Sequence, residues 1–303
     1  MRHLLTGFEF SSDEYLQVLE LAKDMKENPA KYSTNLAGKT VVTLFEKPSL
    51  RTRVTFEAGM YRLGGHSIYL DQKNGEFGHR ESVKDYACNM SRWVNGIVAR
   101  VFLHSTLQEL VKYGSVPVVN ALCDLYHPCQ AIADFQTIRE HYSDLSKVKL
   151  AYLGDGNNVT NSLLIAGAKL GTDVTCVCPK GSGPDVQVYE AACEVAKSTG
   201  AHLRVTDNVD EIIGFDVAYT DTWVSMGDDT PLDMVKSRFM PYQINQQLLD
   251  KTGIKHVLHC QPAHREYEIT SEVMDGPCSL IYDEGENRMH AHMAVLSTLL
   301  NQE

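Results

Sequence analysis

Long apolar stretches are missing from this chain. None approaches the roughly 18 residues that a membrane span requires, and Glu9 comes too early for a signal-peptide core. Basic residues are also scarce, because 28 lysines and arginines against 39 acids give a net charge of −11. A nucleic-acid or anionic-membrane binder needs a broad basic face, which this composition does not favour. We therefore expect a cytoplasmic protein in which any anion site is local.

Cysteine is sparse, with 8 in 303 residues. That number is too low for a disulfide scaffold, and the sequence has neither a C-x-x-C pair nor zinc-type Cys/His spacing. The hydrophobic share of 43% and the charged share of 22% are those of an ordinary globular protein. At roughly 150 residues per domain, the length favours two domains or one large one.

Short apolar runs alternate with amphipathic stretches, the pattern of repeated βαβ units. We expect strands at 39–45, 66–70, 96–101, 115–119, 149–153, 172–178, 202–205, 217–219 and 256–258. Helices are expected at 51–63, 127–141, 160–170 and 287–300. The predicted fold is α/β, with two doubly wound parallel-sheet domains, 1–135 and 136–285, joined by interdomain helices. A C-terminal helix, 286–303, is expected to pack back on the first domain, and the cleft between the domains is the default site.

The sharpest local feature is the run KPSLRTR at 47–53, between an expected strand and an expected helix. A helix N-terminus carries about half a positive charge, so three cations there repel one another unless an anion lies among them. The hydroxyl groups of Ser49 and Thr52, backbone N–H groups and arginine forks can together form a phosphate cradle. The alternative is a solvated basic turn.

Two further features lie at expected strand ends or helix starts. Arg100 ends a strand, and carboxyl ends of strands in open sheets converge on the ligand. His127 opens a helix in the sequence HPCQ, although a lone histidine before proline is more often a cap or a core residue. In this order and spacing, SLRTR, Arg100 and HPCQ resemble the carbamoyltransferase family, whose members bind carbamoyl phosphate with these residues.

Four motifs carry the resemblance through the second half: GDGNN at 154–158, DTWVSMG at 221–227, HCQPA at 259–263 and ENR at 286–288. They resemble the ornithine members of the aspartate/ornithine carbamoyltransferase family, while the aspartate members match this half less well. The resemblance implies transfer of the carbamoyl group of carbamoyl phosphate to the side-chain amine of L-ornithine. It also implies a homotrimer with active sites near subunit contacts, and no metal or organic cofactor.

The resemblance also implies roles for individual residues. Carbamoyl phosphate would be bound by Ser49, Leu50, Arg51, Thr52, Arg53, Arg100, His127, Gln130, Arg288 and the backbone carbonyl of Gln261. Ornithine would be bound by Asn158, Asp221, Ser225 and Met226, with Cys260 beside the reacting amine and coupled to Asp221. The implied catalytic set is Arg100, His127, Asp221, Cys260 and Arg288, and 225–227 would form a lid.

Some of these residues have simpler interpretations. Asn158 can cap the following helix, Asp221 can close a turn, Cys260 can be a plain buried thiol, and Arg53 can face a neighbouring acid. Three positions depart from the usual family pattern. Leu50 lies where family members commonly have Thr, and Gln261 lies where they usually have Leu. Glu76 lies where they commonly have a Gln that reaches the neighbouring subunit's phosphate.

Three rival functions stay open at this point. Gln261 is the main support for a carbamoyltransferase that acts on another amine, such as putrescine. Glu76 hints at a non-catalytic paralogue, because a carboxylate there would repel phosphate. A dinucleotide-dependent oxidoreductase is disfavoured, because the loop after Leu153 reads GDGNNV and not G-x-G-x-x-G.

Overall fold

The structure is a computed structural model that describes residues 1–71, 81–224 and 231–301, apart from the side chains of 232 and 233. The chain divides into two compact units. The first comprises Met1–Gln136 and Glu286–Glu303, and the second comprises Thr137–Gly285. Among the described residues, no helix is both long and apolar enough to cross a membrane.

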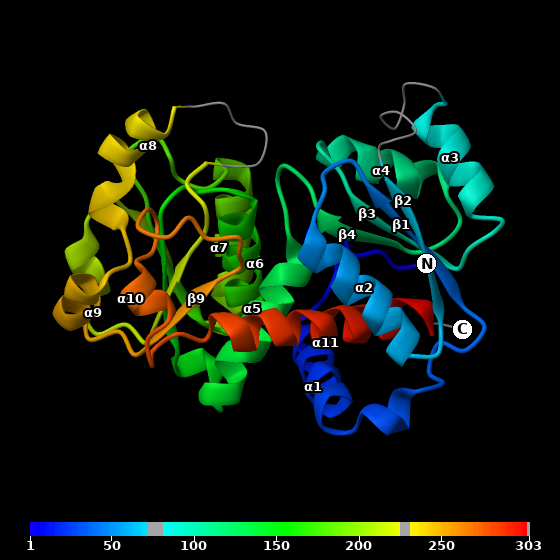
Figure 1. The fold of residues 1–303 in the computed structure, drawn as a ribbon, viewed down its shortest axis with the longest axis horizontal. Helices are drawn as coiled ribbons and strands as arrows, with labels where there is room; N and C mark the ends of the chain where they lie inside the picture. Colours follow the sequence, from blue (N-terminus) through cyan, green and yellow to red (C-terminus); the bar gives the residue numbers. More distant parts are fainter. Residues whose placement is uncertain (72–80, 225–230, 302–303) are drawn as a thin grey trace. The chain divides into compact units, whose positions relative to one another are not determined.

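The first unit contains a four-stranded parallel sheet in the order β2-β1-β3-β4 (Figure 1). Its strands are β1 (Thr40–Phe45), β2 (His66–Asp71), β3 (Gly96–Arg100) and β4 (Val118–Leu122). Its helices are α1 (Ser12–Glu27), a short 3-10 helix (Pro29–Tyr32), α2 (Leu50–Arg62), α3 (Val83–Met90), α4 (His104–Tyr113), the start of α5 (Pro128–His141) and most of α11 (Ile281–Leu300).

Both faces of the first sheet are covered. Alternate strand residues point to opposite faces, and Ile97 and Ala99 pack with residues of α3 and α4 in one buried cluster. On the other face, α11 comes so close that a Cβ at Gly96 would meet Leu300 Cδ2 at 2.8 Å. Glycine therefore allows the C-terminal helix to lie directly against β3.

The second unit contains a five-stranded parallel sheet in the order β7-β6-β5-β8-β9. Its strands are β5 (Lys149–Leu153), β6 (Asp173–Val177), β7 (Leu203–Thr206), β8 (Val217–Thr220) and β9 (His256–His259). Its complete helices are α6 (Asn158–Leu170), α7 (Val186–Thr199), α8 (Leu232–Phe239), α9 (Gln246–Thr252) and α10 (Ser271–Met274), with 3-10 helices at Leu145–Lys147, Val209–Ile212 and Met240–Tyr242.

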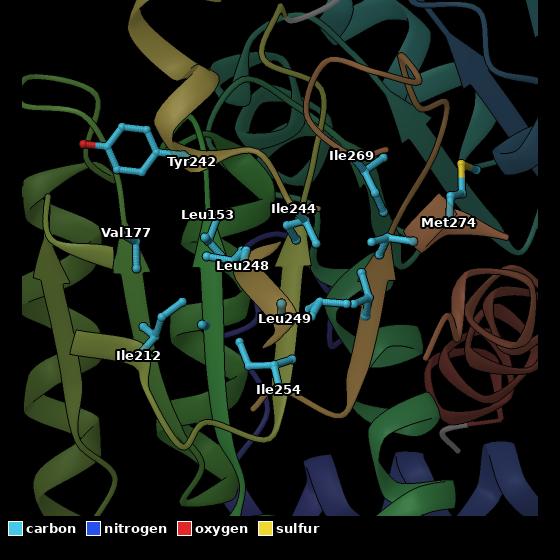
Figure 2. Close-up of a cluster of buried hydrophobic side chains, with 14 of the residues drawn as sticks. Leu153, Val177, Ile212, Tyr242, Ile244, Leu248, Leu249, Ile254, Ile269 and Met274 are labelled. Atoms are coloured by element: carbon cyan, nitrogen blue, oxygen red, sulfur yellow. The ribbon is translucent and has the colours of Figure 1, made fainter. Parts of the chain in front are cut away.

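Part of the core of the second unit is a cluster of buried hydrophobic side chains on one face of its sheet (Figure 2). Leu153 of β5 and Val177 of β6 contribute from the strands, and Leu248, Leu249 and Met274 contribute from α9 and α10. Each fully buried side chain of this size contributes roughly 1.5–3 kcal/mol. This packing holds the carboxyl ends of β5, β8 and β9, and the loops that follow them, on a rigid base.

Side-chain caps and glycines set the helix ends. Ser11 and Glu14 form a capping box at the start of α1, and Asp185 caps α7. Gly171 and Gly200, with φ of 77° and 83°, end α6 and α7 in the left-handed conformation that glycine adopts readily.

The predicted fold class is confirmed, because both sheets are parallel and carry helices between successive strands. Most element bounds lie within one residue of the predicted ones, and three elements differ by more. The strand expected at 115–119 is β4 at Val118–Leu122, since Pro117 has no N–H for a ladder. Helix α6 begins at Asn158 because its N-cap is Asn157. Helix α11 begins at Ile281 and not at 287, and its acidic first turn suits a helix N-terminus.

Candidate active site

In the first unit, the predicted phosphate residues follow the carboxyl ends of neighbouring strands. The 47–53 run follows β1, Arg100 ends β3, and His127 follows β4. The carboxyl ends of parallel strands share one edge of the sheet, where open α/β sheets bind their ligands.

Ser49 is the N-cap of α2. Its Oγ accepts a hydrogen bond from the Thr52 N–H over 3.3 Å and donates to Thr52 Oγ1 over 3.0 Å. Leu50 turns its side chain outward, 77% exposed, and Arg51 is half-buried in the same turn. Because first-turn N–H groups bind anions through the backbone, leucine at position 50 is compatible with the predicted contact.

Thr52 Oγ1 is the meeting point of two arginines. It accepts hydrogen bonds from Arg288 Nη2 over 2.6 Å and from Arg100 Nη1 over 3.5 Å, and all three residues are buried. The register of β3 against β4 shifts at Arg100, an irregularity of the kind that redirects a side chain. A substrate oxygen at this point would meet one hydroxyl group and two guanidinium groups.

Lys47 adds a further positive charge to this group. Burial lowers the pKa of its amine, and the nearby charge of Arg100 lowers it further. Its Nζ lies 4.8 Å from the centre of the Phe102 ring. The sequence interpretation counted Lys47 among the cations of the motif but gave it no role. A bound anion would relieve the part of this lowering that comes from the charge of Arg100.

His127 and Gln130 lie at the start of α5. Burial lowers the pKa of His127 well below its usual range, and the charges of Arg288 and Arg100 lower it further, so the imidazole is neutral at pH 7. Gln130 Nε2 donates a hydrogen bond to Asp134 Oδ1 over 2.7 Å. That bond orients the amide so that its Oε1 is the acceptor that a carbamoyl NH2 group requires.

Arg53 is engaged elsewhere. Its Nε donates to Glu57 Oε1 over 2.9 Å, and its guanidinium lies 3.6 Å from the centre of the Tyr69 ring. Glu57 is thus the neighbouring acid that the sequence interpretation offered as an alternative partner. Arg53 is therefore not part of the candidate phosphate site.

In the second unit, the candidate site residues are grouped around Asp221. It follows β8 and is 8% exposed. Its Oδ1 accepts a hydrogen bond from Cys260 Sγ over 3.1 Å, and its Oδ2 accepts one from Asn157 Nδ2 over 2.9 Å. The structure thus brings Cys260 and Asp221 into direct contact, as the resemblance implies.

Asn157, and not Asn158, caps α6. Asn157 Oδ1 accepts hydrogen bonds from the N–H groups of Val159 and Thr160 over 2.9 and 3.3 Å, while its Nδ2 holds Asp221. The alternative in which Asn158 is the cap is therefore wrong, because Asn158 is the first residue of the helix and is half-buried. Sequence analysis missed Asn157, although an Asn directly before a helical pattern is a typical N-cap signal.

The segment after β9 is held by His259, whose ring is fully buried. Its Nδ1 accepts a hydrogen bond from the Gln261 N–H over 2.9 Å, so the neutral ring carries its proton on Nε2. Nε2 lies 3.2 Å from Glu268 Oε1 and donates to it. The peptide bond between Gln261 and Pro262 is cis. His259 and Glu268, which sequence analysis did not select, fix the backbone beside Cys260.

Several predictions for the site fall outside the described residues. These are the ornithine contacts of Ser225 and Met226, the lid at 225–227 and the departure at Glu76.

One group of described side chains has metal-ligand character. Ligand atoms of Asp221, His259 and Cys260 lie within 4.8 Å of one another. Each of these side chains already takes part in a hydrogen bond, since Cys260 donates to Asp221 and both ring nitrogens of His259 are engaged. In this arrangement the group serves as a hydrogen-bond network.

Comparison with known proteins places both units in one family. Residues 2–140 match the carbamoyl-P binding domain of aspartate/ornithine carbamoyltransferase, and residues 146–299 match its Asp/Orn binding domain. The chain belongs to the aspartate/ornithine carbamoyltransferase family. The predicted family and the predicted enzyme class, a carbamoyltransferase, are thereby confirmed.

Individual relatives within the family are named ornithine carbamoyltransferases. An ornithine carbamoyltransferase of Moritella abyssi is 64% identical over 300 residues, which are 99% of this chain and 100% of that protein. The structure of ornithine carbamoyltransferase from Pyrococcus furiosus matches with a TM-score of 0.95 at 40% identity, covering 100% of this chain and 98% of the other. The anabolic ornithine carbamoyltransferase from Campylobacter jejuni matches with a TM-score of 0.94 at 34% identity, covering 100% of both chains.

Proposed function

We propose that the chain transfers the carbamoyl group of carbamoyl phosphate to the side-chain amine of L-ornithine, releasing L-citrulline and phosphate. The relatives described above are named for this activity, and the two family domains provide one domain for each substrate. The choice of ornithine as the amine rests on the buried carboxylate of Asp221. Asn157 and Cys260 hold this carboxylate by hydrogen bonds, and its negative charge suits an α-ammonium group.

The first unit binds carbamoyl phosphate in this proposal. Backbone N–H groups at the start of α2, together with Ser49 and Arg51, hold the phosphate, and the positive end of the helix favours its charge. Thr52, Arg100 and Arg288 converge on one point, which suits the carbonyl oxygen of the substrate. Neutral His127 adds a donor for the same oxygen, and Gln130 accepts from the carbamoyl NH2 group.

The second unit binds ornithine. Asp221 accepts from the α-ammonium group, and Asn158, Ser225 and Met226 bind the rest of the amino-acid head. Cys260 lies beside the reacting amine, and the carbonyl of Gln261 orients the carbamoyl NH2 group. Putrescine has no α-carboxylate or α-amino head to bind, so these head-group residues favour ornithine.

The chemistry requires a neutral amine, because an alkyl ammonium with a pKa of about 10.4 has no lone pair with which to attack. The amine nitrogen forms a bond to the carbamoyl carbon, and negative charge grows on the carbonyl oxygen. Thr52, Arg100 and Arg288 stabilise that charge as an oxyanion hole does. The C–O bond to phosphate then breaks with its electron pair left on the phosphate oxygen, and the carbonyl group re-forms. The departing phosphate takes the proton that the nitrogen loses, so that citrulline and phosphate remain.

A homotrimer is part of the proposal. Helix α2 carries three apolar side chains on its outer surface, Leu50, Val54 and Tyr61, which are 77%, 51% and 82% exposed. Ile68 on β2, an edge strand of the first sheet, is 42% exposed. Exposed apolar side chains beside an edge strand are typical of an interface with another subunit. Light scattering should give three times the chain mass of 33.8 kDa.

A side-by-side assay tests the function. Purified protein is given carbamoyl phosphate with ornithine, putrescine or aspartate, and ureido product is measured by colour. Preference for ornithine supports the proposal. Preference for putrescine would move the function to another amine and make Gln261 the first residue to examine, while phosphate binding without any turnover would indicate a non-catalytic paralogue.

A further inference from the structure

Helix α11 carries a buried histidine that the proposed mechanism does not use. His292 is 0% exposed, and its ring stacks on the ring of Phe56 with 3.7 Å between centroids and 11° between planes. Among the described residues, neither ring nitrogen of His292 has a hydrogen-bond partner. Burying unpaired polar nitrogens costs roughly 1–3 kcal/mol each, so stability alone does not favour histidine at this position.

The stack lies next to the two residues that meet at the proposed oxyanion position. His292 follows Arg288 by one turn of α11, and Phe56 follows Thr52 by one turn of α2. Residues four apart occupy one helix face, so the two helices meet through two successive pairs. One pair is the hydrogen bond from Arg288 to Thr52, 2.6 Å long, and the other is the ring stack.

The two helices are closely packed along this face. A Cβ at Gly59, on the next turn of α2, would meet Met293 Cγ of α11 at 3.0 Å. With so little space, the thickness of the stacked rings sets the separation and register of the helices one turn from Arg288. A flat ring and a branched aliphatic side chain at 292 would therefore hold Arg288 differently.

We propose that His292 is a positioning residue for Arg288, and that its ring, stacked on Phe56, fixes the guanidinium where it meets Thr52 and the carbonyl oxygen of carbamoyl phosphate. The inference rests on the proposed function, because it assigns that substrate to the first unit. His292 itself touches neither the substrate nor the reacting atoms.

Three variants separate ring stacking from general stability. His292→Leu and Phe56→Leu each remove the stack from one side, whereas His292→Phe keeps a flat ring. We expect either leucine variant to raise the KM for carbamoyl phosphate about tenfold, because a displaced guanidinium group loses about one hydrogen bond to the substrate. The KM for ornithine should stay within about twofold of the wild-type value. His292→Phe should stay close to the wild type. Leu299→Ala, a buried change farther along α11, serves as the stability control and should leave both KM values unchanged.

Binding of inorganic phosphate provides a second readout that does not depend on the amine. Phosphate should raise the Tm of the wild type and of His292→Phe, and should raise the Tm of the leucine variants less. The inference is overturned if the leucine variants keep the wild-type KM and phosphate affinity, if Leu299→Ala raises the same KM, or if His292→Phe is as impaired as His292→Leu. Failure of the wild type to carbamoylate ornithine overturns the proposed function instead, and the phosphate titration then decides the inference alone.

Discussion

Cys260 Sγ donates a hydrogen bond to Asp221 Oδ1 over 3.1 Å, while Asn157 holds the other oxygen of the same carboxylate. Segments that follow β5 and β9 thus fix one acid that follows β8. In this bond the thiol is the donor and the carboxylate is the acceptor, so the negative charge lies on Asp221, the group proposed to meet the ammonium of ornithine.

The first prediction concerns this carboxylate. Asp221→Asn keeps the size of the side chain but removes its charge, and charge-assisted hydrogen bonds contribute roughly 1.5–3 kcal/mol. We expect kcat/KM for ornithine to fall about 10- to 100-fold, with the KM for carbamoyl phosphate within about threefold, because the change lies in the proposed ornithine site. Steady-state kinetics with each substrate varied in turn measures both values. Equal loss for both substrates would contradict the assignment.

The second prediction separates the two asparagines at the start of α6. Asn157→Ala removes both the helix cap and the hydrogen bond to Asp221, so we expect a loss of about 1 kcal/mol in stability and a rise in the KM for ornithine. Asn157→Asp keeps an acceptor for the cap but places a second negative charge beside Asp221. It should therefore keep most of the stability while still weakening ornithine binding.

Asn158→Ala is the matched control for the cap. It should lower the free energy of unfolding less than Asn157→Ala does, because Asn157 and not Asn158 caps the helix. Urea unfolding and ornithine kinetics on the same preparations check these expectations. A loss of stability in Asn158→Ala equal to that in Asn157→Ala would contradict the assignment of the cap.

Sequence analysis could predict those parts of the fold and site that local rules determine. The cation-rich run at 47–53 predicted the start of α2, and short apolar runs predicted the positions of the strands. Those rules could not reveal the contact between Thr52 and Arg288, which lie 236 positions apart. The buried pair of His259 and Glu268 has no periodic or capping signal, because the fold of the segment after β9 brings the two side chains together. Tertiary packing supplies what local patterns lack.

The third prediction contrasts two arginines of α2. Arg51→Ala removes a guanidinium from the first helical turn, and loss of a charged phosphate contact should lower kcat/KM for carbamoyl phosphate by about 100-fold. Arg53→Ala should change it by less than about threefold, because Arg53 is exposed and paired with Glu57. Phosphate inhibition constants for the two variants provide an independent check. If Arg53→Ala is the more damaging change, the proposed phosphate cradle is assigned to the wrong arginine.

The last prediction concerns stability below neutral pH. Burial lowers the pKa of both His127 and His292 well below its usual range, and the charge of Arg288 lowers both further. Below a pH of about 6.5 the unfolded chain binds protons at these two positions that the folded chain does not. The free energy of unfolding should therefore decrease as pH falls below that value, by up to about 1.4 kcal/mol per pH unit for each histidine.

Replacing one of these histidines should reduce that slope. His292→Phe removes one group that the unfolded chain would protonate, so its free energy of unfolding should fall less steeply than that of the wild type between pH 6.5 and 5. His66→Gln is the control, because it removes a histidine whose side chain is exposed in the folded protein. Urea unfolding across this pH range measures the three slopes. If the slope for His292→Phe equals that of the wild type, the ring of His292 does not stay neutral in the folded protein.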